Sequence, residues 1–307
     1  MTRDRVETMA NTSPGSLFVF GLGYSAQALG RDLQAKGWQV AGTSRSLEGC
    51  AYLASHGFNA FVFSHHTGLL PQARTALAAA THVLSSIPPD PSGDPVLNLT
   101  DKILMRLKKV QWIGYLSTTG VYGDWHGKEV TEQSECHPTS DRTRRRLAAE
   151  AAWRDLFYHH RLPVHLFRLA GIYGPGYSVF DDVRMGKAQR IDKPGHTFSR
   201  IHVDDITQIL FASMQKPDPG ALYNLCDDEP AEPATVVTEA CALLGVEPPP
   251  LIPFAEAQLS DMGRSFWRDH KRVSNAKIKT DLGIRLLCPT YREGLRRILA
   301  AETLSNR

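Results

Sequence analysis

Residues 17–45, LFVFGLGYSAQALGRDLQAKGWQVAGTSR, decide the fold of this chain. The opening apolar run LFVF is short and unbroken, which is typical of a parallel strand buried on both faces of a sheet. After the glycines, Ala28, Leu29 and Leu33 repeat at the spacing of a helix. The segment therefore predicts a strand, a glycine turn, a helix and, from Trp38 onward, a second strand.

The glycine turn has the pattern Gly-x-Gly-x-x-Ala, which indicates a dinucleotide site. Gly21 permits a tight turn, and Gly23 lets the backbone approach a pyrophosphate. Ala26 is small enough for the helix to pack on the strand, and the helix N-terminus, which includes Tyr24 and Ser25, directs its amides at the phosphates. The alternative is an ordinary strand-to-helix turn that binds no ligand.

The end of the second strand favours NADP(H) over NAD(H). A site for NAD usually places a carboxylate there to bind the ribose 2′-hydroxyl. This chain has Ser44 and Arg45 instead, with no acid before Glu48. A guanidinium forms bidentate, charge-assisted hydrogen bonds to phosphate, so Arg45 is predicted to bind the 2′-phosphate of NADP. The alternative is a solvated arginine.

Composition sets limits on the class of protein. With 307 residues the chain forms one large domain or two closely joined ones and can bury a substantial core. Its 42% hydrophobic and 22% charged content is that of a globular enzyme, and a net charge of +3 does not indicate nucleic acid as a partner. We therefore expect a small-molecule substrate and a monomer or homodimer.

Location is predicted from cysteines and apolar runs. The five cysteines lie far apart, without Cys-x-x-Cys spacing or paired histidines, which predicts neither a disulfide framework nor a metal site and fits the cytoplasm. Residues 1–16 are polar and lack the apolar core of a signal peptide, so we interpret them as a flexible tail. The chain has no run of about eighteen apolar residues, so no contact with a membrane is expected.

Helical and strand-like segments keep alternating after Arg45. The expected helices are 47–56, 72–80 and 95–108, and the expected strands are 58–63, 81–86 and 111–116. This pattern predicts an α/β fold with a Rossmann-type doubly wound parallel sheet, in which ligand-binding loops meet beyond the carboxyl ends of the strands. Ser86, Ile87 and Pro88 leave one such end and are predicted to border the adenine ribose and pyrophosphate. The alternative is a proline-stiffened loop without ligand contacts.

Hydroxyl groups gather where the strand at 111–116 ends, in the stretch Ser117-Thr118-Thr119-Gly120-Val121-Tyr122-Gly123. Such side chains cap turns, and in a nucleotide crevice they also polarise a substrate carbonyl or alcohol. At this point the chain resembles the extended short-chain dehydrogenase/reductases, the superfamily of NAD-dependent epimerases and dehydratases, in which a Ser or Thr lies four residues before the Tyr of Val-Tyr-Gly. Here that position is Thr118.

Further segments carry the same resemblance over most of the chain. Residues 167–176 (FRLAGIYGPG), 200–206 (RIHVDDI) and 222–225 (LYNL) are similar to the superfamily, and 271–275 with 289–295 point to its atypical, YeeZ-type branch.

The resemblance implies a domain organisation. Residues 17–175 form an NAD(P)-binding Rossmann domain to which 200–226 return, and 176–199 with 227–307 form a smaller C-terminal α/β substrate lobe. Within that lobe, the aromatic and basic side chains of residues 265–272 are candidates to close over an anionic ligand. The alternative for them is core and solvated surface.

The departure from the family is informative. The superfamily's catalytic Tyr-x-x-x-Lys precedes a Glu, and counting back from Glu150 places Arg146 and Arg142 at the Lys and Tyr positions. Arginine cannot exchange a proton near neutral pH, because its pKa exceeds about 12. Arg146 retains the donors to bind the nicotinamide ribose. Arg142, on the same helix face, is predicted to bind an anionic substrate, whereas Arg144 and Arg145 are interpreted as solvated.

Three side chains are candidates to replace the lost acid: Tyr122, Tyr173 and His202. The resemblance places Tyr173 beside the nicotinamide. The alternatives are that Tyr122 packs beneath the hydroxyl loop, that each tyrosine is an ordinary buried one, and that His202 is structural, before a helix capped by Asp204 or Asp205.

Two functions follow from these assignments. The first is an NADP(H)-binding oxidoreductase or epimerase/dehydratase-like enzyme that acts on a small anionic or nucleotide-linked molecule, with catalytic residues Thr118, Tyr122, Arg146 and Tyr173 and with Thr119 and Arg142 on the substrate. The second is a catalytically degraded protein that senses NADP(H).

Overall fold

The computed structural model describes residues 14–305. Its centre is an eight-stranded sheet with the order β12-β8-β6-β5-β1-β2-β3-β4, parallel throughout except for the pairing of β3 with β4. The strands are β1 (Ser16–Phe20), β2 (Gln39–Ser44), β3 (Asn59–Ser64), β4 (Gly68–Leu69), β5 (His82–Ser85), β6 (Trp112–Thr118), β8 (Val164–Leu169) and β12 (Leu222–Leu225).

The strand order reverses between β1 and β5, as in a doubly wound sheet. Val19 of β1 lies beside Gly42 of β2 on one side and beside Leu84 of β5 on the other. The chain therefore leaves β1 in one direction and returns to its other edge, which opens a crevice at the carboxyl ends of these strands. Because the sheet is covered on both faces, β1 is almost entirely apolar and four of its five residues are buried.

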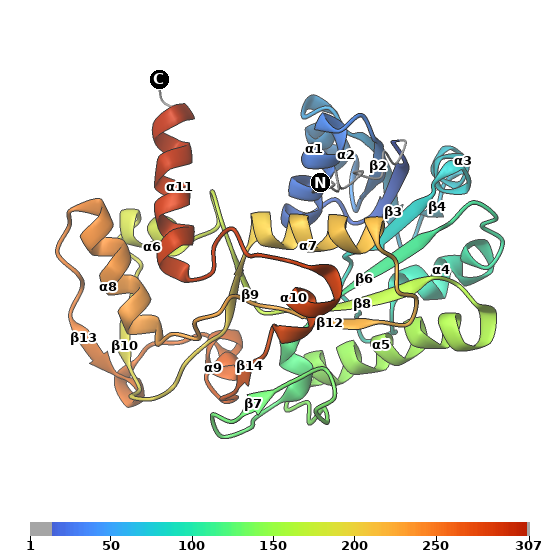
Figure 1. Cartoon of the computed structure of the whole chain (residues 1–307). Coiled ribbons are helices and arrows are strands. Elements are labelled where there is room, and N and C mark those ends of the chain that lie inside the picture. Colours follow the sequence, from blue (N-terminus) through green and yellow to red (C-terminus); the bar gives the residue numbers. More distant parts are fainter. Residues whose placement is uncertain (1–13, 306–307) are drawn as a thin grey trace, which may run out of the picture.

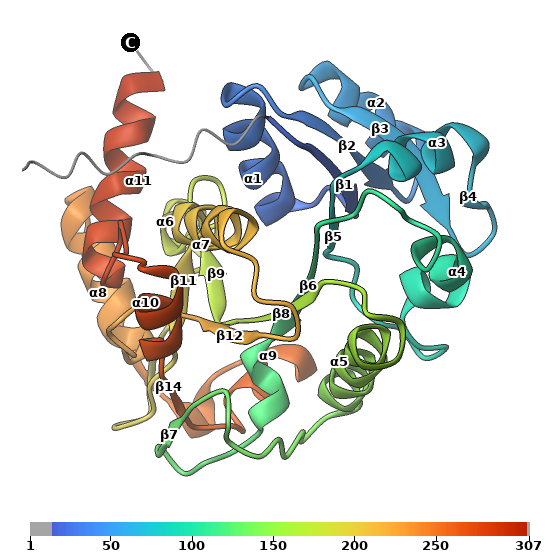
Figure 2. The same cartoon turned by 45° about the vertical axis from the view of Figure 1, so that its right-hand side comes forward.

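Helices cover both faces of the sheet (Figures 1 and 2). One core joins the sheet to α1 (Tyr24–Ala35), α2 (Leu47–Ser55) and α7 (Val203–Gln215), through side chains such as Leu29, Leu53 and Ile206. The other core contains side chains of α3, α4 and α5. Those helices are α3 (Pro71–Ala79), α4 (Pro95–Leu104) and α5 (Asp141–His160).

A smaller lobe lies beside the carboxyl edge of the sheet (Figure 1). It is built from short parallel strand pairs and helices that share a separate apolar cluster around Phe180, Ala240 and Leu295. Its elements are β9 (Gly171–Tyr173), α6 (Val179–Arg184), β10 (Arg190–Asp192), β11 (Arg200–His202), α8 (Pro233–Leu244), β13 (Leu251–Pro253), η2 (Phe254–Glu256), α9 (Asp261–Phe266) and α11 (Tyr291–Ser305).

The predicted fold class is confirmed, and the boundaries differ in detail. Strand β1 begins at Ser16, inside the predicted tail, and residues 1–13 of that tail lie outside the described residues. The predicted helix from Pro95 ends at Leu104. No helix in the described part of the chain is long and apolar enough to cross a membrane.

Strands β9 and β11, predicted in the Rossmann domain, pair with each other in the smaller lobe, and two further segments cross the predicted boundary. Helix α10 (Ala276–Leu282), expected in the substrate lobe, packs against β12 and α7, and Ile278 is fully buried in the core of the sheet. Conversely, β7 (Glu129–Val130) pairs with β14 (Arg272–Val273). The C-terminal segment therefore contacts both parts of the protein. Apolar side chains such as Ile278 are buried in the core of the sheet, and this burial stabilises the contact.

Candidate functional site

The glycine turn between β1 and α1 is tied to both neighbouring strands. Gly21 has a φ of +85°, a conformation that a residue with a Cβ rarely adopts. Its amide donates to Oγ1 of Thr43 at 2.9 Å, and the Leu22 amide donates to the Thr43 carbonyl, also at 2.9 Å. The Ser86 hydroxyl donates to the carbonyl of Gly21. The turn is thus held in place before any ligand binds.

Gly23 leaves open space at the start of α1. It occupies the N-cap position without a side chain to bond the first amides of the helix, and a Cβ built there meets nothing within 4 Å. Ser25 and Ala26 are buried, so only their backbone is available to a ligand. Unpaired amides at a helix N-terminus bind phosphate, and this turn fits the pyrophosphate of a dinucleotide.

Tyr24 connects this turn to the smaller lobe. Its hydroxyl donates to the Pro175 carbonyl at 3.0 Å, and its ring lies against Tyr177 with the centroids 5.4 Å apart. Burial and the nearby carboxylate of Asp204 raise the pKa of Tyr24 to about 12. The side chain therefore acts as a neutral link between the two parts.

The remaining predicted nucleotide contacts border the same crevice. Arg45 follows β2, is exposed, and forms no ion pair with any described residue. Ser44 is half-buried, next to Gly49. After β5, Ile87 is half-buried and lies against the Cα side of Gly21, whereas Pro88 is exposed. These positions suit the predicted contacts with the ribose and pyrophosphate, which stay predictions.

A cavity of about 720 Å³ lies at the carboxyl ends of β6 and β8. Its walls are the loop after β6, the first turns of α5, strands β9 and β11, helix α9 and the segment before β14. Four cationic side chains line it, against a single carboxylate, that of Asp269. They are Arg142, Arg146, Arg200 and Lys271. The cavity therefore suits an anionic molecule.

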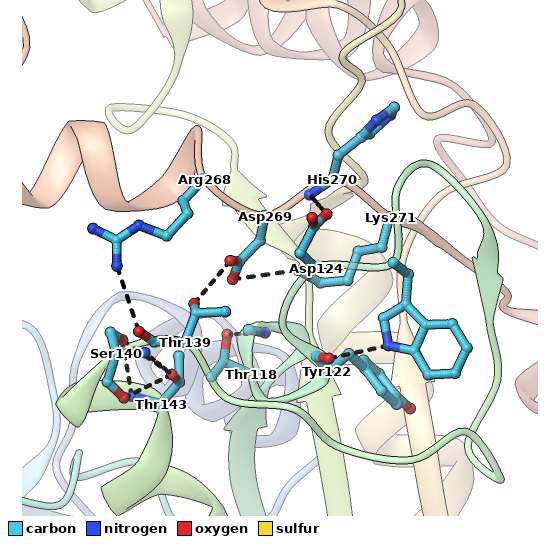
Figure 3. Close-up of polar contacts among 12 residues, drawn as sticks. Thr118, Tyr122, Asp124, Thr139, Ser140, Thr143, Arg268, Asp269, His270 and Lys271 are labelled. Atoms are coloured by element: carbon cyan, nitrogen blue, oxygen red, sulfur yellow. Dashed lines mark hydrogen bonds and ion pairs between the residues drawn. The ribbon is translucent and has the colours of Figure 1, made fainter.

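Thr118 and Thr119 lie in the wall of this cavity, as predicted. Thr118 is the N-cap of the short helix η1 (Thr119–Tyr122), where its Oγ1 accepts the Gly120 amide at 3.1 Å (Figure 3). The hydroxyl proton of Thr118 remains free to be donated, since this bond uses only an oxygen lone pair. Both threonines are therefore placed to contact a substrate oxygen.

Tyr122 does not line the cavity. Its side chain is fully buried, its hydroxyl donates to Oδ1 of Asn224 at 2.8 Å, and the Arg168 guanidinium lies 4.6 Å from the ring centroid. Burial raises the pKa of Tyr122 to about 12. This position does not fit the predicted catalytic role and matches the alternative, a tyrosine packed beneath the hydroxyl loop.

Tyr173 presents its ring, and not its hydroxyl, near the cavity. The hydroxyl is buried and has no hydrogen-bond partner among the described residues. It lies against Gly294 of α11, where a Cβ would come within 2.0 Å of it. Burial, with further contributions from Asp227 and Cys288, raises the pKa of Tyr173 well above its usual range. A proton donor for substrate needs a reachable hydroxyl, so this placement too does not fit the catalytic prediction.

His202 is structural. Its Nδ1 accepts the Asp204 amide at 3.1 Å, so His202 itself caps α7. The expectation that Asp204 or Asp205 caps this helix is wrong, because Asp205 accepts the amides of Leu287 and Cys288 instead.

The two arginines in the Tyr and Lys positions face the same cavity, as their spacing predicts. Arg146 donates through Nη1 to the Leu116 carbonyl at 2.8 Å and to the Tyr115 hydroxyl at 3.1 Å, which holds it at the end of β6. Arg142 is exposed, with its guanidinium 4.5 Å from the centroid of the Phe266 ring. The cavity thus has one cation held by hydrogen bonds, Arg146, and a more exposed one, Arg142, at its rim.

A buried ion pair supports the hydroxyl loop from behind. Glu150 of α5 and Arg168 of β8 form a bidentate pair, with 2.7 Å between Arg168 Nη2 and Glu150 Oε2, and Ser117 donates to the same carboxylate. Both charged side chains are almost entirely buried. The pair fixes α5 against β6 and β8, and thereby the wall that carries Arg146 and Thr118.

Sequence reasoning missed Asp269 and its partners. Asp269 accepts a hydrogen bond from Oγ1 of Thr139 at 2.8 Å and lies 3.9 Å from the Nζ atom of Lys271 (Figure 3). Thr139 and Asp269 are 130 residues apart in the chain, so no local sequence pattern predicts this contact. The sequence predicted no site role for Arg200, which also lines the cavity. Residues 265–272 do line the cavity in part, through Phe266, Trp267 and Lys271 among others.

The chain is similar in sequence or structure to several known proteins. No family model matches it. Protein YeeZ of Escherichia coli K12 is 29% identical over 245 residues, which cover 75% of this chain and 84% of that protein. The structure of a functionally unknown conserved protein from Silicibacter pomeroyi is 45% identical, with a TM-score of 0.86, over 94% of this chain and 99% of that one.

A more distant structure shares the fold. UDP-glucuronic acid 4-epimerase from Bacillus cereus, solved with UDP-glucuronic acid and NAD, is 15% identical with a TM-score of 0.73, over 94% of this chain and 99% of that one. These similarities extend along both the sheet and the smaller lobe. The chain is thus similar to protein YeeZ and to the Silicibacter pomeroyi protein, and it shares the fold of the NAD-dependent epimerase/dehydratase structures.

Proposed function

We propose that this protein is an NADP(H)-dependent oxidoreductase or epimerase-like enzyme that acts on a small anionic molecule. One observation carries the proposal: an open glycine turn and a cation-lined cavity share the carboxyl edge of one parallel sheet, at β1 and at β6 with β8. In this arrangement a dinucleotide bound at the turn reaches the cavity. Cytoplasmic location and a monomeric or homodimeric state stay predictions.

The residues of the turn fit a dinucleotide. Backbone amides at Gly23 and the first turn of α1 would hold the pyrophosphate, Arg45 the 2′-phosphate, and Arg146 the nicotinamide ribose. The bound cofactor supplies hydride transfer. The protein's own side chains then position the substrate, and Thr118 hydrogen-bonds the oxygen at the reacting carbon.

The substrate class follows from the charges of the cavity. Four cations against one carboxylate favour a ligand with two or more negative charges, such as a nucleotide-linked sugar acid. UDP-glucuronic acid, the ligand of the Bacillus cereus epimerase, is a member of that class and serves as the first probe.

The second candidate is a sensor of NADP(H). It is favoured by the arginines at the Tyr and Lys positions and by the buried hydroxyls of Tyr122 and Tyr173. We place the enzyme first because Thr118 and Lys271 face the cavity, where a protein that only binds nucleotide has no use for them.

Calorimetric titration of wild type and Arg45→Ala with NADPH and NADH tests the cofactor. Loss of a charge-assisted bond should weaken NADPH binding by about 1.5–3 kcal/mol and leave NADH binding nearly unchanged. Arg31→Ala, which removes an exposed arginine farther along α1, should change neither. Equal losses for both nucleotides in Arg45→Ala would contradict the 2′-phosphate assignment.

Turnover separates the two candidates. Wild-type protein that binds NADPH is mixed with UDP-glucuronic acid and NADP⁺, or with a panel of carbonyl compounds and NADPH, and the absorbance of the reduced nicotinamide is followed. Hydride transfer with any of these, or conversion of UDP-glucuronic acid to an epimer detected by NMR, supports the enzyme, whereas tight NADPH binding with neither result favours the sensor.

A further inference from the structure

Hydride transfer to a carbonyl requires a partner that exchanges a proton with the substrate oxygen. The titratable side chains that line the cavity, apart from its arginines, are Tyr173, Tyr177, Asp269 and Lys271. The hydroxyl of Tyr173 is buried against Gly294. Tyr177 is 60% exposed and its ring rests on Tyr24, on the rim. Asp269 and Lys271 remain, and they lie side by side.

The backbone around Lys271 is held from two directions. Strand β14 begins at the next residue and pairs in parallel with β7, with Arg272 opposite Glu129. One residue earlier, the His270 amide donates to Oδ1 of Asp124 at 2.8 Å. Lys271 thus extends into the cavity from a fixed position and not from a loose loop.

The side chain of Lys271 is oriented by a carboxylate that is itself anchored. Only 12% of the Lys271 side chain and 10% of the Asp269 side chain are exposed, and Nζ lies 3.9 Å from Oδ2 of Asp269. The other oxygen of Asp269 accepts the Thr139 hydroxyl. A dashed line in Figure 3 marks the ion pair between Lys271 and Asp269, and Thr118 lines the same cavity as both.

We propose that Lys271, positioned by Asp269, is the group that exchanges a proton with the substrate oxygen bound beside Thr118. This inference rests on the proposed NADP(H)-dependent function. Arg142 cannot exchange a proton near neutral pH. The amine of Lys271, which enters the cavity from the C-terminal segment, takes that role.

The surroundings of the amine make both of its protonation states accessible. Burial lowers the pKa of Lys271, and the carboxylates of Asp269 and Asp124 act in the opposite direction. The other charged groups that face it across the cavity are cations, Arg142 and Arg146 on α5 and Arg200 on β11, and they disfavour a further positive charge. A buried lysine whose pKa is lowered gives up its proton more readily than an exposed lysine does, whereas an arginine stays charged.

The proton transfer balances as follows in the reductive direction. The carbonyl carbon gains a hydride from the reduced nicotinamide, and the π electrons of the C=O bond move to oxygen. The Lys271 ammonium gives its proton to that oxygen, so an alcohol forms and the amine is left neutral. Water then returns a proton to the amine. In the oxidative direction the neutral amine removes the hydroxyl proton as the hydride leaves.

Reductive labelling of the wild-type protein tests whether Lys271 is a reachable neutral amine. Pyridoxal 5′-phosphate, an anionic aldehyde, forms a Schiff base only with the unprotonated form, and borohydride fixes it for peptide mass spectrometry. A lowered pKa raises the neutral fraction of the amine, so Lys271 should be labelled faster than exposed lysines at neutral pH. UDP-glucuronic acid should slow the labelling.

Two variants define the expected pattern. Asp269→Asn removes the carboxylate that favours the ammonium and should speed the labelling of Lys271. Lys193→Met removes a lysine that is not among the residues lining the cavity and that donates to the Trp267 carbonyl, and it should leave the labelling of Lys271 unchanged. The proposal is overturned if wild-type Lys271 is labelled no faster than exposed lysines, whatever the variants do.

An independent measurement follows the charge directly. Lysines methylated with ¹³C-formaldehyde give one NMR signal each, and Lys271→Met identifies the signal of Lys271. Its titration midpoint should lie below those of the exposed lysines; a midpoint among theirs contradicts the proposal. NADPH binding to Lys271→Met should equal that of wild type. If wild type itself fails to bind NADPH, the proposed function falls, whereas the labelling and the titration still decide the state of the amine.

Discussion

The glycine turn and the cation-lined cavity differ in the groups that they offer to a ligand. At the glycine turn the features proposed to bind the pyrophosphate are backbone ones: a glycine in a left-handed conformation, an N-cap without a side chain and the first amides of α1. On the substrate side they come from charged and hydroxyl side chains on α5, β11 and the segment before β14. The glycine turn is formed by residues that are close together in the chain, whereas the cavity is lined by residues between Thr118 and Val273.

This difference explains why one side follows the family pattern and the other departs from it. A backbone site tolerates almost any side chain provided that the glycines remain, because the glycines alone set the space for the pyrophosphate. A side-chain site changes its chemistry with each substitution. Arg142 and Arg146 make one wall of the cavity cationic, and Lys271 enters the same cavity from another element.

The largest expected effect is on the backbone side. Gly23→Val should reduce NADPH and NADH binding below detection, because the side chain fills the space that the pyrophosphate needs. The same space is free in the folded protein, so stability should fall by no more than about 1 kcal/mol. Calorimetry and urea unfolding measure the two quantities. Unchanged nucleotide affinity would show that the turn binds no pyrophosphate.

The second effect concerns the support of the substrate side. Arg168→Met leaves Glu150 as a buried, unpaired charge, and the free energy of unfolding should fall by about 3–5 kcal/mol. Arg144→Met breaks an exposed pair with Asp141 on the same helix and should cost less than about 1 kcal/mol. Urea unfolding of both variants gives the comparison. Similar losses in the two would mean that the buried pair does not hold the cavity wall.

The third effect concerns the pH dependence of stability that the buried carboxyl group of Asp227 causes. Asp227 is 2% exposed, and neither of its carboxyl oxygens has a hydrogen-bond partner among the described residues. Burial raises the pKa of Asp227 to about 8, although Arg200 opposes the shift.

Because the folded state keeps this proton after the unfolded chain has released it near pH 4, stability should fall as the pH rises from about 4 to about 8. The slope from this group is at most about 1.4 kcal/mol per pH unit. Asp227→Asn should flatten that part of the curve of melting temperature against pH. Parallel curves for the two proteins would exclude Asp227 as the cause.

The smallest effect is expected at the rim of the cavity. Arg142 is exposed and rests on Phe266, so Arg142→Ala should weaken the binding of UDP-glucuronic acid by only about 1 kcal/mol, less than a buried partner would. NADPH affinity should stay the same. Arg154→Ala, at an exposed position farther along α5, is the matched control. If Arg142→Ala binds UDP-glucuronic acid as tightly as wild type does, Arg142 is not part of the anion site.

The sequence by itself determined the sheet, the glycine turn and the position of Thr118. These features depend on short-range patterns: an unbroken apolar run, two glycines before a helix, and hydroxyls directly after a buried strand. Because parallel strands bring their carboxyl ends to one edge, the pattern also placed the turn and Thr118 on the same side of the sheet.

Only the tertiary structure decided where the hydroxyls of Tyr122 and Tyr173 point and which charges meet in the cavity. Tyr122 turns to Asn224 and Tyr173 to Gly294, each more than a hundred residues away in the chain. Asp269 likewise meets Thr139 only after the C-terminal segment crosses back to pair β14 with β7. A side chain's direction is set by the packing around it, and here that packing comes from distant segments, so no local pattern records it.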